Sequence, residues 1–186
     1  MKKWISFGLA TMLLTPIAGW CGSNKFVDSD DYKDKEFKKC SISDYAHLVE
    51  GDDVNWIWVA DGIKTSNFKL SIGGVQNIAL NKKTSDTEAV KTSFQQVIND
   101  IDSKGKSEKA TADICIYEIQ EFSYGKAWIP FVGGHQAQAG VGVEVILKDK
   151  NKKTVAEFRH FTREGARTQE AATEAAEDIT KFISKN

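Results

Sequence analysis

The sequence has few of the residues from which catalytic and metal sites are built. Its 186 residues include three cysteines, three histidines and two prolines. The cysteines form no CxxC pair and no Cys/His spacing typical of a metal site. His47, His135 and His160 lie in different expected elements, whereas a catalytic or metal site needs convergent partners. The sequence therefore predicts no catalytic residues, no metal site and no cofactor.

An excess of charge of one sign is also absent. Lys and Arg total 25, Asp and Glu total 26, and the formal net charge is −1. The two signs are interspersed, so no basic face is expected for nucleic acid and no polybasic cluster for anionic lipid. The glycines at 133, 134, 140 and 142 match no nucleotide-binding loop. Glycine inside a strand more often marks a bulge or close packing.

The sequence also lacks a long hydrophobic run. Its longest apolar run is short and lies near the start of the chain. Lys2 and Lys3 precede an apolar run over residues 4–14, then Pro16 and the small residues Ala18 and Gly19 follow. This order is typical of a secretory signal, and the run is too short to span a bilayer. We predict that residues 1–21 are a signal peptide and that the protein is exported to the periplasm or outer membrane.

The position of signal cleavage decides the fate of Cys21. Lipoprotein signals carry small residues directly before the acylated cysteine, but Trp20 stands immediately before Cys21 here. Lipidation of Cys21 and ordinary cleavage after Gly19 both stay open. An acyl group on Cys21 is the single membrane attachment that we expect.

After the signal, the composition indicates one domain preceded by a charged segment. Residues 22–39 are dense in Asp and Lys and show no sustained apolar periodicity, which predicts a flexible solvated tether. Residues 40–186 are long enough for a single α/β domain with a sizeable core.

Two cysteines remain as a pair if Cys21 is acylated. In an oxidising compartment, Cys40 and Cys115 are then expected to form a disulfide, worth roughly 2–4 kcal/mol if unstrained. The alternative is that Cys115, inside an apolar run, is a buried thiol.

The domain reads as mostly β, with apolar and polar residues alternating. Strands are expected at 42–49, around 56–59, and at 68–72 continuing to 80 after a bulge or turn at Gly73 and Gly74. Three more are expected at 112–122, 137–147 and 154–161, of which the last two form an antiparallel hairpin.

Two amphipathic helices complete the pattern. One begins at the capping box SDTE of residues 85–88 and ends near Gly105. The other spans 168–184, with an apolar stripe rich in alanine. Two amphipathic helices and an antiparallel sheet must bury their apolar faces against each other. The predicted fold is therefore α+β, a two-layer arrangement with a predominantly antiparallel sheet packed by two helices.

The most apolar connection in the chain is the first choice for a functional surface. It spans residues 124–135, and its candidate partner-binding residues are Tyr124, Trp128, Phe131 and His135. Aromatic residues on a glycine-rich loop can form a binding surface. The alternative is that Trp128 and Phe131 fold back onto the core.

Three further groups have ordinary explanations. The acidic residues at 50, 52, 53 and 61 lack a calcium-loop motif and indicate a solvated turn. Trp56 and Trp58 suggest core packing or one side of a ligand groove. Arg159, Arg163 and Arg167 could bind an anionic partner, but they are expected to form surface ion pairs by default.

Three stretches carry a family resemblance: WIWVADGI at 56–63 leading into FKL, VGVEVILKD at 141–149 continuing through KTVAEF, and AEDITKFI at 176–183. Together they resemble an uncharacterised family of exported bacterial envelope domains, often lipoproteins. The resemblance implies a small α/β domain with a non-enzymatic role and no established catalytic residues.

These observations favour a non-catalytic, envelope-associated binding or assembly module that contacts another envelope protein. The alternative is a periplasmic small-ligand-binding protein or secreted enzyme, with Trp56, His135 or His160 in a pocket between sheet and helices. A third hypothesis is self-association through an exposed strand edge. The sequence does not set the oligomeric state.

Overall fold

The computed structural model describes residues 25–80, 83–101, 106–128 and 133–186. Its centre is a six-stranded sheet with the order β1-β2-β6-β5-β4-β3. Neighbouring strands are antiparallel except β3 and β4, which run parallel. The strand bounds are β1 Val49–Glu50, β2 Trp56–Val59, β3 Phe68–Asn77, β4 Glu108–Gln120, β5 Gly140–Asp149 and β6 Thr154–Arg163.

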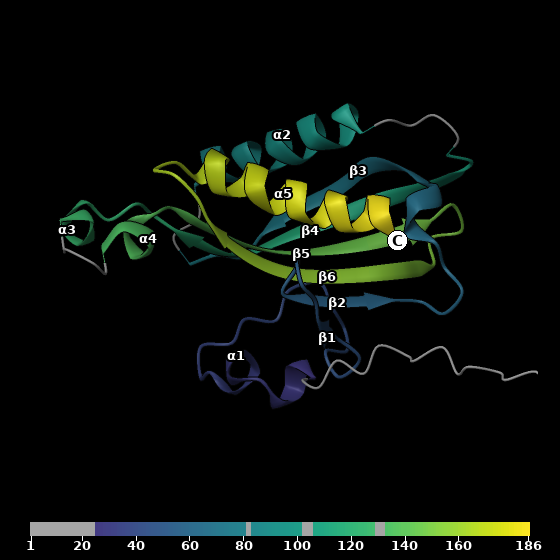
Figure 1. The fold of residues 1–186 in the computed structure, drawn as a ribbon, viewed down its shortest axis with the longest axis horizontal. Helices are drawn as coiled ribbons and strands as arrows, with labels where there is room; N and C mark the ends of the chain where they lie inside the picture. Colours follow the sequence, from purple (N-terminus) through teal and green to yellow (C-terminus); the bar gives the residue numbers. More distant parts are fainter. Residues whose placement is uncertain (1–24, 81–82, 102–105, 129–132) are drawn as a thin grey trace, which may run out of the picture.

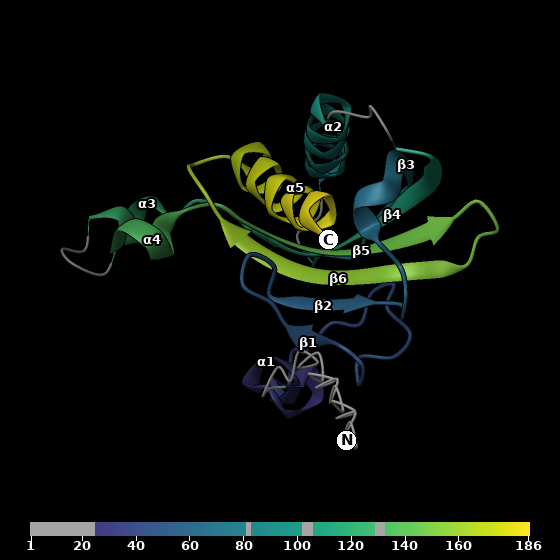
Figure 2. The same ribbon diagram turned by 45° about the vertical axis from the view of Figure 1, so that its right-hand side comes forward.

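Two long helices cover one face of this sheet. Helix α2 spans Thr84–Asp100 and α5 spans Thr168–Lys185, and both lie over the same face (Figures 1 and 2). The main core fills the space between helices and sheet, and includes Phe94, Phe158 and Ile179. The predicted α+β class, with two helices packed on a mostly antiparallel sheet, is confirmed.

The alanine stripe of α5 lets the helix approach the sheet closely. Ala171, Ala172, Ala175 and Ala176 are all fully buried. Small side chains allow the helix backbone to lie near the strands, and Ile183 in the last turns of the helix is buried as well. Phe182 is only partly buried, and its ring packs edge-on against Phe158 with 5.6 Å between centroids.

Part of the opposite face of the sheet is also covered, by residues 25–48, here called the N-terminal strap. The strap holds a 3-10 helix η1 (Phe26–Asp28) and a short helix α1 (Asp30–Lys33). Phe26 is fully buried in a second cluster with Tyr45 and Trp56. Residues 25–39 thus differ from the solvated tether expected for 22–39, because their few aromatic residues pack against the sheet.

The strand expected at 42–49 is wrong. Strand β1 is confined to Val49–Glu50, and the residues before it form turns and irregular backbone. Ile42, Tyr45 and Leu48 are buried without forming a ladder. Their spacing therefore reflects packing of an irregular segment onto a sheet, which gives a similar apolar pattern.

The remaining elements follow the expected order with shifted ends. The β5–β6 hairpin is confirmed, and β3 has the expected irregularity between Ile72 and Val75. Helix α2 ends at Asp100, earlier than expected, and the predicted stop at Gly105 lies outside the described residues. Strand β5 begins at Gly140 because a short helix α4 (Gly133–Ala137) precedes it.

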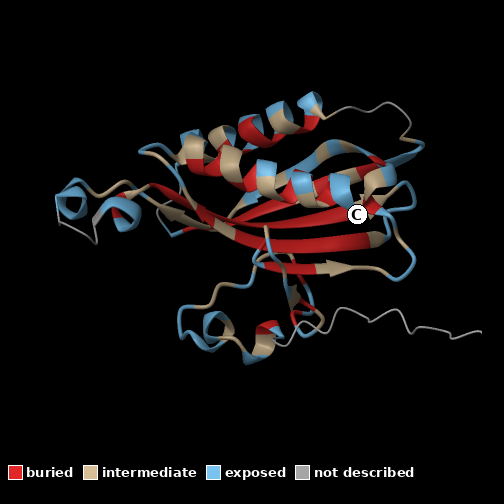
Figure 3. Cartoon of the chain, viewed as in Figure 1, coloured by how far each residue is buried: buried red, intermediate tan, exposed pale blue. Residues whose placement is uncertain are grey.

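Burial is greatest in the middle strands. Figure 3 shows β5 and β6 buried along most of their length, since helices cover one face and the strap the other. Within the described part of the chain, we find no helix both long and apolar enough to cross a membrane.

Candidate functional site

A row of polar and ionised residues crosses the sheet beneath the strap. The strand registers pair Cys115 with Glu144, Glu144 with Arg159, and Arg159 with Trp56. Their sequence neighbours, such as Ile114 and Val143, face the helix-side core. Because successive residues of a strand point to opposite faces, this row faces away from the helices and toward the strap.

The disulfide fastens the strap to one end of this row. Cys40 and Cys115 are joined, with their Cα atoms 6.0 Å apart and a sequence separation of 75. This is the pairing that the sequence favoured. Cys115 is fully buried whereas Cys40 is partly exposed.

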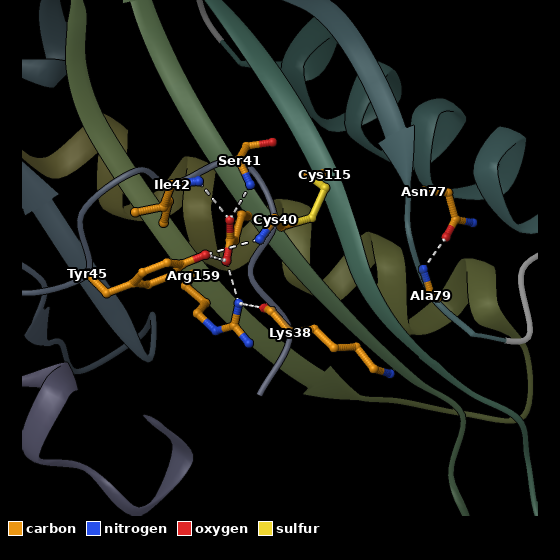
Figure 4. The surroundings of a disulfide bond; sticks show 10 residues. Lys38, Cys40, Ser41, Ile42, Tyr45, Asn77, Ala79, Cys115 and Arg159 are labelled. Atoms are coloured by element: carbon orange, nitrogen blue, oxygen red, sulfur yellow. Dashed lines mark hydrogen bonds and ion pairs between the residues drawn. A yellow bond between two sulfur atoms is a disulfide. The ribbon is translucent and has the colours of Figure 1, made fainter. Parts of the chain in front are cut away.

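Glu144 is the centre of the row and is fully buried. Its carboxylate accepts hydrogen bonds from the backbone N–H groups of Ser41 and Ile42, at 2.7 and 2.9 Å, and from the Tyr45 hydroxyl at 2.8 Å. The Arg159 guanidinium forms an ion pair with the same carboxylate. Figure 4 shows Ser41, Ile42, Tyr45 and Arg159 close together beside the disulfide. A buried charge requires such complete pairing.

The guanidinium group of Arg159 contacts aromatic rings from both the sheet and the strap. The guanidinium carbon lies 3.6 Å from the Tyr117 ring centroid and 4.6 Å from that of Phe37. Its Nη1 also donates to the Lys38 carbonyl oxygen at 3.2 Å. The default expectation of a surface ion pair is wrong for Arg159, which is buried. Cation–π contact and an ion pair replace the water that a surface arginine would keep.

The other two arginines lie nearer the surface. The Nε of Arg163 donates to the Gln120 side chain at 3.1 Å. Arg167 pairs with Glu170 three residues later, and the Arg167 side chain is exposed. Arg167 therefore follows the expectation of a surface ion pair.

Burial raises the pKa of two tyrosines in this region. Desolvation raises the pKa of Tyr45, and the neighbouring Glu144 charge raises it further. Desolvation also raises the pKa of Tyr117. Tyr45 accordingly stays a hydroxyl donor to Glu144, and Tyr117 donates to the His160 carbonyl oxygen at 3.3 Å.

A cleft of about 540 Å³ opens between the strap and the sheet. Phe37 and Lys38 line it from the strap, and Trp56, Tyr117 and Arg159 line it from the sheet. Trp56 donates its indole N–H to Asp31 at 3.3 Å. The groove at Trp56 therefore lies on the face opposite the one where a pocket between sheet and helices was considered.

The three histidines lie in separate settings. His47 contacts Glu157 at 2.7 Å, and His160 contacts Asp178 at 3.0 Å. Burial lowers the pKa of His160, against the opposing effect of Asp178. His135 is exposed on α4 and bonds Gln138 at 2.8 Å. Neither His135 nor His160 lines the cleft at Trp56.

The acidic turn is tied to α5. Asp53 pairs with Lys181 at 3.0 Å and Lys185 at 3.3 Å, and hydrogen bonds from these two lysines lower the pKa of Asp53. Among the residues that the structure describes, no group of three or more His, Cys, Asp or Glu side chains is arranged to hold a metal ion.

The segment expected to bind a partner stands apart from the body of the protein. Helices α3 (Tyr124–Ala127) and α4 (Gly133–Ala137) form a small lobe beyond the end of the sheet (Figures 1 and 2). Trp128 is 86% exposed and Tyr124 is 78% exposed, so Trp128 does not fold back onto the core. Phe131 lies outside the described residues, as does the lipidation candidate Cys21.

Sequence reasoning missed Glu144 as the buried centre of the row. Glu144 lies at the centre of VGVEVIL, residues 141–147. A single charge inside an otherwise apolar strand is a signal that could have marked it, because a buried carboxylate needs partners. Its partners on the strap lie about a hundred residues away in sequence, so spacing alone could not identify them.

Comparisons with known proteins give no assignment. No family model matches the chain, and no curated protein matches it. Weakly similar solved structures include two PelC dodecamers from Paraburkholderia phytofirmans. A point variant has a TM-score of 0.40 and 14% identity, covering 69% of this chain and 93% of that one. The second has a TM-score of 0.38 and 13% identity, covering 69% and 96%.

A third weakly similar structure comes from Caulobacter crescentus and is described as a "putative lipoprotein". Its TM-score is 0.32 and its identity is 11%, covering 66% of this chain and 91% of that one. At these TM-scores and identities we assign neither a family nor a function to this chain from the comparisons.

Proposed function

We propose that the protein is a non-catalytic, envelope-associated binding or assembly module, which contacts another envelope protein through the α3–α4 lobe. The observation that carries the proposal is the exposure of Trp128, 86%, together with that of Tyr124, 78%, on the same lobe. Large aromatic side chains are enriched in protein interfaces and are costly to leave in water.

The base of the lobe is fixed to the body by backbone hydrogen bonds. The Ser123 N–H donates to the Ala137 carbonyl oxygen at 2.9 Å, which joins the segments that enter and leave the lobe. Ala139 then donates to the Gly165 carbonyl oxygen at 3.1 Å. A partner that binds Tyr124 and Trp128 would therefore be held at a defined position relative to the sheet.

Location in the envelope rests on the N-terminal sequence and on the disulfide. Residues 1–21 have the order of a secretory signal. The Cys40–Cys115 disulfide supports export, since such bonds persist mainly in oxidising compartments. Periplasmic and outer-membrane locations differ by the fate of Cys21, and we include both in the proposal.

A role without catalysis is supported by how the ionisable residues are used. Glu144 and Arg159 neutralise each other and anchor the strap. His47 and His160 each contact a carboxylate of a different element. Each of these ionisable residues therefore has a structural role in the fold. The function that we propose is binding.

The test is capture of the partner by the purified protein. We expect Trp128→Ala to reduce capture from membrane extracts of the native host by at least tenfold, with an unchanged thermal unfolding midpoint. The matched control is Leu80→Ala, because Leu80 is 81% exposed and lies outside the lobe. Equal capture by the two variants, or unfolding of Trp128→Ala, contradicts the proposal.

A further inference from the structure

The strap is attached to the sheet by two different kinds of anchor on neighbouring strands. Cys40 is bonded covalently to Cys115 on β4. The next two residues, Ser41 and Ile42, donate their backbone N–H groups to Glu144 on β5. Cys115 and Glu144 are direct register partners, so the covalent and hydrogen-bonded anchors lie side by side.

The covalent anchor restricts what the hydrogen-bonded anchor can do. While the disulfide is intact, Cys40 cannot leave β4, and Ser41 and Ile42 stay within reach of Glu144. Local opening of the strap is then suppressed even if its hydrogen bonds break for a moment. Without the disulfide, opening is opposed by the hydrogen bonds and by the packing of buried strap residues such as Phe26 and Leu48. Segments at the edge of a fold open locally more often than its central strands.

We infer that residues 25–48 act as a redox-sensitive strap, which a dithiol releases from the sheet by reducing the Cys40–Cys115 disulfide. Release opens the cleft of about 540 Å³, which Arg159 lines, and exposes the ion pair that Arg159 forms with Glu144. The inference is independent of the proposed role of the α3–α4 lobe, which lies elsewhere on the molecule.

The chemistry of release is a two-step thiol–disulfide exchange. A thiolate of the dithiol attacks the sulfur of Cys40, the more exposed cysteine of the pair. This forms a mixed disulfide and expels the Cys115 thiolate, which takes up a proton. The second thiol of the reagent then attacks the mixed disulfide and frees Cys40. The protein gains two electrons and two protons, and the dithiol is oxidised to its cyclic disulfide.

The released strap leaves an ion pair that can persist in water. Glu144 loses the donors from Ser41, Ile42 and Tyr45 but keeps Arg159. Because Arg159 and Glu144 belong to neighbouring strands of the hairpin, the pair does not depend on the strap. Opening therefore does not strand an isolated charge on the sheet.

Amide hydrogen exchange on the full chain tests this inference. The chain carries Cys21→Ser, so Cys40 and Cys115 are the two cysteines left. We expect dithiothreitol to accelerate exchange at Ser41 and Ile42 by at least tenfold, while residues 141–147 of β5 exchange at an unchanged rate. The β5 amides serve as the check that the fold is intact.

A variant separates loss of the disulfide from other effects of the reductant. Cys40→Ser/Cys115→Ser, in the same Cys21→Ser background, should show the fast exchange at Ser41 and Ile42 without any dithiothreitol. Unchanged exchange of the strap on reduction would overturn the inference, because the hydrogen bonds would then hold it alone. Equal acceleration in strap and β5 would overturn it too, since the disulfide would then stabilise the whole domain.

Discussion

At the scale of single residues, Glu144 connects most of the features found on the strap side of the sheet. It neutralises Arg159, whose guanidinium contacts the rings of Tyr117 and Phe37. It also receives two backbone donors from the strap. Loss of one partner of a buried ion pair is costly mainly because the other charge is left uncompensated.

Glu144→Gln should therefore destabilise the protein by about 3 kcal/mol. The amide keeps the size of the side chain but lacks the charge that Arg159 requires. It also presents N–H donors where the carboxylate accepts hydrogen bonds. The measurement is the free energy of unfolding by urea.

The matched control for this variant is Glu118→Gln. Glu118 lies beside the cleft but is only partly buried, so its replacement should change the free energy of unfolding by less than about 0.5 kcal/mol. Similar losses of unfolding free energy in the two variants would show that the buried ion pair of Glu144 does not contribute specially to stability.

At the scale of elements, the glycines of β5 leave space for aromatic side chains of the two neighbouring strands to pack against the β5 backbone. A Cβ atom at Gly142 would lie 2.5 Å from two ring carbons of Tyr117, and one at Gly140 would lie 2.8 Å from Phe161. Since real Cβ atoms do not approach so closely, a side chain at either position would have to displace the neighbouring ring. The interpretation of strand glycines as markers of close packing is confirmed here.

Gly142→Ala should cost about 1–3 kcal/mol, because the Tyr117 ring must move and lose its contact with Arg159. Gly125→Ala in α3 is the control, since a Cβ there meets nothing within 4 Å and alanine favours a helix. Thermal unfolding of the two variants measures the difference. An equally mild effect at Gly142 would mean that the ring relaxes freely.

Elements with strong periodicity were predictable from sequence, whereas irregular packed segments were not. Helix α5 and the β5–β6 hairpin follow directly from their patterns, with β5 beginning three residues later than expected. The predictions for the strap differ from the structure in two ways. Residues 22–39 were expected to be a solvated tether, and residues 42–49 were expected to form a strand. In both places a few residues, such as Phe26 and Tyr45, decide the structure through contacts distant in sequence.

At the scale of the whole molecule, the buried residues that stabilise the fold and the proposed binding surface lie in different regions. The helices bury one face of the sheet and the strap buries part of the other, and the α3–α4 lobe extends beyond the end of the sheet (Figure 1). The sequence could place the candidate residues Tyr124 and Trp128 on a connection between strands. It could not decide between surface and core, because a short apolar segment is compatible with both.

This separation allows the lobe to be probed without disturbing the fold. A photo-crosslinking amino acid can replace Trp128, whose side chain is 86% exposed, or Leu80, whose side chain is 81% exposed outside the lobe. Replacement at either position should leave the thermal unfolding midpoint unchanged.

Crosslinking at these two positions in living cells of the native host is the most direct test of an envelope module acting through the lobe. The account predicts one discrete crosslinked product from position 128, recovered with the envelope fraction, and none from position 80. No product from position 128, or the same products from both positions, would contradict it.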